Sequence, residues 1–200
     1  MKKIGMIILG ISMGMSLMAQ KDASKAFLDS YYHEANAEYS EAISDMDATY
    51  SETSYSINLR LGWLHYLDGD YYKSISYYNK AIALESKSIE ARLGFVYPSS
   101  AMQNWEEVLK MYNEILTIDP NNTAVNYKLG YMYYLRGDWV NAEASLLKVL
   151  NLYPFDYDSN LLLGTVNVKM GKIKEARVYY TRALEYDPSS SEIRGLLKGL

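Results

Sequence analysis

Apolar and polar positions alternate with a helical period along the stretch Lys128–Pro154, which reads KLGYMYYLRGDWVNAEASLLKVLNLYP. Glycine and proline residues interrupt the large apolar residues at fixed positions. Gly137 can adopt the left-handed conformation that ends a helix at low cost, and Asp138 can cap a second helix. Pro154 lies where a proline commonly follows a helix end. The pattern predicts a first helix ending near residue 136, a tight turn and a second helix ending before Pro154.

The same glycine and proline positions recur along the chain with a spacing of 34 residues or twice that number. Such a fixed period indicates a repeat architecture, because each unit contributes one supersecondary element. The aligned columns are Gly69, Gln103, Gly137 and Gly171; Pro120, Pro154 and Pro188; Tyr71, Trp105, Trp139 and Ile173; Tyr78, Tyr112, Leu146 and Tyr180; and Ala81, Ile115, Val149 and Ala183. Each unit is predicted to be a helix, a tight turn and a second helix.

Gly130 lies inside the first predicted helix of its unit, where glycine costs about 1 kcal/mol relative to alanine. We therefore expect a neighbouring helix to approach closely there, with Ala142 and Ala176 as small partners on the second helices. In the third unit, Pro98 cannot donate a hydrogen bond to the carbonyl of Gly94, so we expect a kinked or shortened helix between Ile89 and Gln103. Two interpretations of that break are a tolerated irregularity and an opening for a ligand.

At these residues the chain resembles the tetratricopeptide repeat (TPR) family, whose pattern reads W-x2-L-G-x2-Y followed by G, A, F or Y, A and P. In residues 123–156 the pattern is matched by Leu129, Gly130, Tyr133, Gly137, Ala142 and Pro154, with Asn126 in place of Trp. In residues 157–190 it is matched by Leu163, Gly164, Gly171, Ala176, Tyr180, Ala183 and Pro188. Residues 55–88 also match, residues 89–122 match in the second helix, and residues 23–54 form a degenerate first repeat.

The resemblance implies an all-α, right-handed superhelical solenoid of about five repeats, with residues 191–200 as a C-terminal cap. Residues 20–200 would form one TPR solenoid domain. The first helix of each repeat would line a concave face, where one helical stripe is apolar and aromatic. The predicted partner-binding residues are Leu59, Trp63, Tyr66, Tyr127, Tyr131, Tyr134, Leu161, Thr165 and Val168.

Residues 1–19 have the pattern of a secretory signal peptide. Lys2 and Lys3 precede a charge-free apolar run from Ile4 to about Met18, and cleavage is expected after Ala19. The alternative is an uncleaved membrane anchor, although the run is short for a span of about 20 residues. No cysteine is present, which excludes lipid attachment at a cysteine, disulfides and Cys-ligated metals. The expected location is the periplasm or the outside of the cell.

The chain has a formal charge of −4, and removal of residues 1–19 would make it −6. This acidity argues against nucleic acid and anionic lipid as partners. Its two histidines, His33 and His65, have no metal-binding spacing, and His65 is expected to be a core or interhelix residue. We expect neither an enzyme nor a cofactor or metal site.

The sequence pattern is compatible with three functions. The first is a scaffold that binds a polypeptide in the aromatic concave groove. The carboxylate-clamp subset of the family holds a chain terminus with Lys, Asn and Arg, but Leu59, Trp63, Tyr127 and Tyr131 occupy those places here. The second is a structural or assembly role through self-association or the C-terminal helix with Leu196, Leu197 and Leu200, which leaves a homo-oligomer open. A glycan partner is ranked lower.

Overall fold

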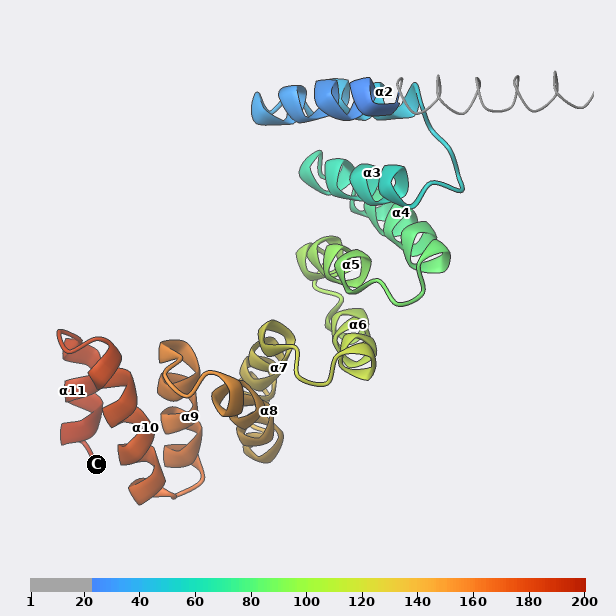
Figure 1. The fold of residues 1–200 in the computed structure, drawn as a ribbon. Helices are drawn as coiled ribbons and strands as arrows, with labels where there is room; N and C mark the ends of the chain where they lie inside the picture. The colour runs from blue at the N-terminus through green and yellow to red at the C-terminus, as the bar shows by residue number, and fades with distance from the viewer. Residues whose placement is uncertain (1–22) are drawn as a thin grey trace, which may run out of the picture. The chain divides into compact units, whose positions relative to one another are not determined.

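The computed structural model describes residues 23–200, which form helices joined by short loops, and this range contains no strand (Figure 1). The first helix covers residues 23–35. The helices that follow are α2 (Tyr39–Asp47), α3 (Tyr55–Leu67), α4 (Tyr71–Leu84), α5 (Ile89–Ala101), α6 (Trp105–Ile118), α7 (Thr123–Leu135), α8 (Trp139–Leu152), α9 (Tyr157–Lys169), α10 (Ile173–Tyr186) and α11 (Ser191–Lys198). The predicted signal peptide lies outside the described residues. Within them, no helix has the length and apolar character to cross a membrane.

The helices come in regular pairs, which confirms the predicted all-α helix-turn-helix fold. The first members α3, α5, α7 and α9 each have 13 residues, and the second members α4, α6, α8 and α10 each have 14. Each of α3, α7 and α9 packs most extensively against the helix that follows it in the chain. A period of 34 residues therefore corresponds to one pair and its two loops.

The chain divides into two compact units, residues 1–111 and 112–200, with the division inside α6. In the first unit, Ala42 and Met46 of α2 pack with Ile57, Leu61 and Leu64 of α3. In the second unit, α8 packs between α7 and α9, and α10 packs between α9 and α11. The expectation that residues 20–200 form a single domain stays a prediction.

The turn inside each pair has the predicted backbone conformation. Gly69, Gly137 and Gly171 have φ values of +84°, +74° and +73°, in the left-handed region that favours glycine. Asp70 and Asp138 then accept hydrogen bonds from the backbone N–H groups of Lys73 and Asn141, so both predicted helix caps are confirmed. The glycine and the cap together reverse the chain within a few residues.

Two other turns adopt the left-handed backbone conformation without a glycine. Ala37 and Gln103 both have a φ of +59°, which costs a residue with a Cβ about 1–2 kcal/mol. We therefore expect Gln103→Gly to raise the free energy of unfolding by about 0.5–1 kcal/mol, after allowance for the greater chain entropy of glycine. Urea denaturation followed by circular dichroism measures this change. Gln103→Ala serves as the control, because it keeps a Cβ at the same φ and should leave stability nearly unchanged.

The glycines inside the first helices meet large side chains of the partner helix. A Cβ added at Gly164 would lie 2.5 Å from the Tyr180 ring, and one at Gly130 would lie 2.8 Å from Leu146. The predicted close approach is confirmed, and its nearest atoms belong to large side chains. Ala142 also lies at this interface, with its carbonyl oxygen 3.5 Å from the same point, and the side chain four residues later reaches further across it.

The prediction that the first helix of the third repeat is shortened is wrong. α5 has the same 13 residues as its counterparts, with Pro98 inside it. Proline removes one hydrogen bond near the end of the helix, and the next turn is still closed by the Met102 N–H donating to the Pro98 carbonyl at 3.0 Å. Pro98 is also buried, so packing offsets the lost bond. The predicted kink and the predicted opening for a ligand stay predictions.

A buried asparagine in the first helix ties down the loop that precedes it. Asn126, which stands where the family pattern has Trp, donates from Nδ2 to the carbonyls of Pro120 and Asn122 at 3.1 and 2.9 Å. The same position in two other repeats makes the same pair of bonds: Asn58 and Asn160. Buried backbone carbonyls need such partners, so the residue that departs from the family pattern stabilises the connection between successive pairs.

Candidate protein-binding groove

A groove of about 990 Å³ lies in the first unit, between the first helix and helices α3 and α5. Residues 27, 31, 34 and 35 of the first helix form one wall, since they are three or four positions apart and share a face. Ser56, Leu59, Arg60 and Trp63 of α3 also line it, and Leu59 and Trp63 are among the residues predicted to bind a partner. The remaining lining side chains come from Tyr78 of α4 and from residues 89–97 of α5.

Three aromatic rings meet at one end of this groove. Trp63 and Tyr66 lie one turn apart on α3 with ring centroids 5.5 Å apart, and Tyr97 of α5 lies 5.7 Å from Trp63 and 5.5 Å from Tyr66. Tyr97 is 50% exposed, whereas the two α3 rings are partly buried. We call these residues the aromatic cluster. Rings that pack against one another at the surface provide a rigid apolar contact area at low entropic cost.

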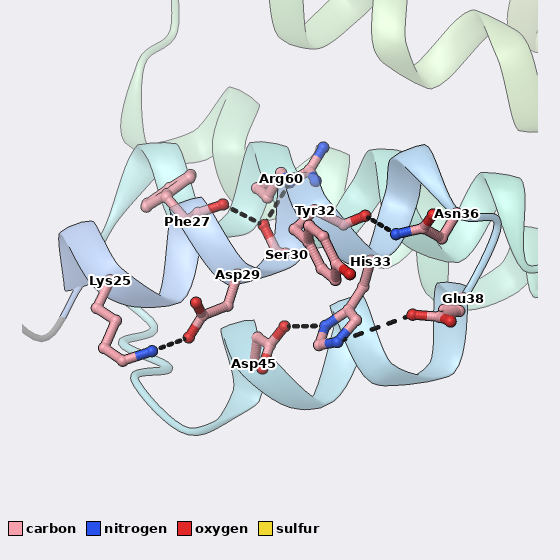
Figure 2. Close-up of polar contacts among 10 residues, drawn as sticks. All are labelled: Lys25, Phe27, Asp29, Ser30, Tyr32, His33, Asn36, Glu38, Asp45 and Arg60. Carbon is pink, nitrogen blue, oxygen red and sulfur yellow. Dashed lines mark hydrogen bonds and ion pairs between the residues drawn. The ribbon is translucent and has the colours of Figure 1, made fainter.

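A buried ion pair lies beside the aromatic cluster. Glu34 of the first helix pairs with Arg60 of α3 and accepts a hydrogen bond from the Trp63 indole N–H at 2.7 Å. Arg60 also donates from Nε to the Ser30 hydroxyl at 3.1 Å, as Figure 2 shows, and its guanidinium lies 3.8 Å from the centre of the Tyr31 ring. The network joins the first helix to α3 and fixes the orientation of the indole.

One buried polar group in the groove lacks a protein partner. The Arg60 side chain is only 5% exposed, and its Nη2 makes no hydrogen bond. Tyr78 lines the groove with its ring buried between α3 and α5, and that burial raises the pKa of its hydroxyl well above the usual value. A buried donor without a partner is costly, so it marks a place where a bound ligand can supply an acceptor.

The predicted residues of the fourth repeat lie in the second unit on α7. Tyr131 is 44% exposed and stacks on Tyr134 with centroids 6.4 Å apart, and Tyr134 also contacts Trp139. Tyr127 lines a separate depression of about 420 Å³ with Lys128, Asp156 and Asp158. Burial raises the pKa of the Tyr127 hydroxyl. Tyr131 is the exposed ring of the three, whereas Tyr127 and Tyr134 also pack against the core cluster of α8 and α9.

The predicted residues of the fifth repeat have a packing role in the second unit. Leu161 and Val168 pack against the cluster of Tyr180, Ala183 and Ile193, to which α11 also contributes leucines. The Thr165 hydroxyl lies 3.1 Å from the Tyr180 hydroxyl and donates to the Leu161 carbonyl. Binding through these three side chains stays a prediction.

The sequence reasoning missed the groove residues outside the predicted stripe: Tyr31, Glu34, Arg60 and Tyr97. The first repeat is too degenerate for its columns to align, and Tyr97 lies in the segment where Gly94 and Pro98 suggested a break. One signal was available, because Arg60 is a charged residue inside a run that is otherwise apolar from Leu59 to Leu64. An arginine in that position requires a buried acidic partner.

The two histidines are in opposite environments. His33 Nδ1 bonds to the Asp45 carboxylate at 2.7 Å, and its Nε2 lies 3.8 Å from Glu38 (Figure 2). The hydrogen bond to Asp45 raises the pKa of His33. His65 is 5% exposed and stacks on Tyr77 at 5.3 Å, and its burial lowers its pKa. The interhelix position predicted for His65 is confirmed.

The raised pKa of His33 predicts a pH-dependent contribution to the stability of the first unit. The contribution is fully present below the unfolded pKa of about 6.5, and it is lost as the pH rises through the raised folded value. Asp45, Glu38 and Glu41 are the charged groups that favour the protonated ring. His33→Gln should therefore destabilise the chain more at about pH 5.5 than at about pH 8.5. Urea denaturation at both pH values checks this, and an equal cost at both would contradict it.

Models of the tetratricopeptide repeat match this sequence in three places: residues 55–88 and 157–190 match one model, and residues 124–156 match another. The TPR repeat-containing protein MJ1428 of Methanocaldococcus jannaschii is 28% identical over 139 residues, which are 67% of this chain and 24% of that protein. Superkiller protein 3 of Schizosaccharomyces pombe is 21% identical over 182 residues, which are 88% of this chain and 13% of that protein. The chain thus spans about a quarter or less of the length of these relatives.

Solved structures share the fold. A crystal structure of the MamA protein superposes with a TM-score of 0.71 at 17% identity, covering 84% of this chain and 93% of that one. A tetratricopeptide repeat protein from Parabacteroides merdae gives a TM-score of 0.74 at 16% identity, covering 90% of this chain and 72% of that one. The helix pairs, the glycine turns and the matching models agree, and the chain is a member of the tetratricopeptide repeat family.

Proposed function

We propose that this protein is an interaction scaffold that binds a polypeptide segment through the aromatic faces of its first helices. The observation that carries the proposal is the groove of the first unit, where the aromatic cluster lies beside a buried arginine with an unused donor. Accessible aromatic patches supported by rigid neighbours are typical of binding sites. An extended or helical segment supplies both apolar side chains for the rings and carbonyl oxygens for the unused donor.

The tyrosines of α7 support a second contact area. Tyr127, Tyr131 and Tyr134 present partly exposed rings on one helix face, as the sequence predicted for the concave stripe. A TPR protein that binds through several repeats gains affinity from contacts that are weak one at a time. Loss of one ring should therefore reduce binding, and loss of rings in both units should abolish it.

The proposed location is the cell envelope or the outside of the cell, after removal of residues 1–19. This rests on the sequence pattern of the N-terminal segment alone. We propose no catalytic role. His33 bonds to a carboxylate between two helices and His65 is stacked in the core, so both have structural contacts that explain them.

The alternative is an assembly role through self-association at the C-terminal helix. Leu196, Leu197 and Leu200 would have to face a second chain, but in the second unit they pack against the cluster of Tyr180, Ala183 and Ile193. The apolar face of α11 is therefore largely used within its own unit. This packing favours the polypeptide-binding groove over the cap as the contact surface.

Site-specific photo-crosslinking in cells tests the proposal. The photoreactive residue benzoylphenylalanine replaces Tyr97 in the groove or Tyr131 on α7, and it replaces Tyr72 as the matched control. Tyr72 is 77% exposed on α4 and does not line the groove. Mass spectrometry should identify the same polypeptide crosslinked at positions 97 and 131 and not at 72. Equal crosslinking at all three positions, or none at 97 and 131, would contradict the proposal, and crosslinked dimers would favour self-association.

A further inference from the structure

Negative charge is concentrated in the first unit. Residues 23–111 contain 13 Asp and Glu but seven Lys and Arg, which gives a formal charge of −6. Residues 112–200 contain ten of each and are formally neutral. The groove with the aromatic cluster thus belongs to the acidic part of the chain, and its potential attracts positively charged segments.

The charges that line the groove sum to the same sign as the unit. Arg60 is the one cation among its lining residues, and the pair with Glu34 compensates that charge. Glu90 also lines the groove, and among the described residues it makes no ion pair. Its carboxylate accepts a hydrogen bond from the Tyr55 hydroxyl at 3.2 Å, which holds it at the groove edge. One uncompensated negative charge therefore remains at the site.

Aromatic rings that line the groove also suit a cation. The faces of tryptophan and tyrosine rings carry negative potential and attract ammonium and guanidinium groups. The groove already contains one such contact, between the Arg60 guanidinium and the Tyr31 ring at 3.8 Å. On the opposite side, Tyr97 is half exposed and packs edge-on against Trp63, with an interplanar angle of 75°. Part of this aromatic surface is free for a ligand.

The unused donor of Arg60 supplies the second recognition element. Its Nη2 is buried and has no acceptor, and the guanidinium carbon lies 3.8 Å from the centre of the Tyr31 ring. The guanidinium charge is already balanced by Glu34, so a neutral carbonyl oxygen suits this donor and a further carboxylate is not needed. The peptide bonds of a bound segment offer such a carbonyl.

We propose that the groove of the first unit selects a polypeptide segment bearing a lysine or arginine among apolar residues. The basic side chain pairs with Glu90, apolar side chains of the segment pack on the aromatic cluster further along the groove, and a backbone carbonyl of the segment accepts from Arg60. This deepens the proposed function and rests on it, because it specifies the partner's chemistry at that same site. An acidic segment or a C-terminal carboxylate would meet the uncompensated charge of Glu90 unfavourably.

Selection from a displayed library of random peptides on the full chain tests this inference. Peptides enriched in Lys or Arg beside apolar residues are expected, and added salt should weaken their binding. Trp63→Ala should reduce affinity about tenfold or more, and Glu90→Gln about two- to fivefold. Glu52→Gln removes an exposed acid of the same unit outside the groove and should leave affinity unchanged.

The outcomes separate the two proposals. Selected peptides without basic residues, whose binding still depends on Trp63, would overturn the inference and retain the scaffold function. Basic peptides whose affinity falls equally with Glu52→Gln and Glu90→Gln would also overturn it, because the attraction would then come from the net charge of the unit and not from the groove. A library that yields no peptide sensitive to Trp63→Ala would contradict both proposals.

Discussion

Gly94→Ala is expected to destabilise the protein by about 2–3 kcal/mol, although alanine is the better helix former by about 1 kcal/mol. A Cβ at position 94 would lie 2.1 Å from Cε1 of Tyr78, which no side chain tolerates without displacement. The ring is 2% exposed and touches α3 on its other side, where a Cβ at Gly62 would be 3.0 Å away. Because Tyr78 has no free space, α5 itself must move.

Urea denaturation followed by circular dichroism measures this effect against two controls. Gly195→Ala adds a methyl group to α11, where no atom lies within 4 Å, and it should stabilise the protein slightly. In a Tyr78→Leu background, Gly94→Ala should cost much less, since leucine lacks the Cε1 and Cζ atoms that clash. An unchanged cost in that background would show that the ring is not the obstacle.

Glu34→Gln is expected to destabilise the protein by about 2–3 kcal/mol, because it leaves the buried Arg60 without a compensating charge. The figure is below the usual range for buried pairs, since the Glu34 side chain is 23% exposed and water screens part of the interaction. The amide oxygen of glutamine can still accept from the Trp63 indole. The loss therefore reports on the ion pair and not on the indole contact.

The exposed pair of Lys110 and Glu107 provides the matched control for this change. Its atoms are 3.4 Å apart and both side chains are well exposed, so Glu107→Gln should change stability by less than about 0.5 kcal/mol. Arg60→Met together with Glu34→Gln should recover part of the loss in denaturation experiments, because the unpaired buried charge is then absent. Full additivity of the two substitutions would argue against a coupled pair.

The ion pair also bears on the candidate site. It places Trp63 by a hydrogen bond to Glu34 and leaves one Arg60 donor unused beside the aromatic cluster. A weakened pair should therefore reduce peptide binding as well as stability, whereas Gly94→Ala acts first on the packing of α5. Comparing the two variants at temperatures where both are folded separates the positioning of the site from the stability of its unit.

The repeat pattern could be predicted from the sequence because it depends on local rules for turns, helix caps and helical spacing. The glycines at 69, 137 and 171 mark turns, the aspartates at 70 and 138 cap the following helices, and each first and second helix has the predicted place in its pair. Trp63 and Leu59 followed from the same helical spacing. Periodicity identifies which residues share a helix face, and this requires no knowledge of distant contacts.

Tertiary packing decided the features that depend on residues far apart in the chain. Local rules favoured a shortened helix at Pro98, but α5 has its full length. Both Pro98 and Gly94 are buried in it, and Gly94 lies against the Tyr78 ring. The nearest neighbour of Gly130 is the Leu146 side chain, which lies closer than Ala142 because it reaches further across the interface. The groove itself needs Glu34, Arg60 and Tyr97 from three helices to meet. The sequence by itself thus determined the helix pairs, and the tertiary structure determined which of their faces form a site.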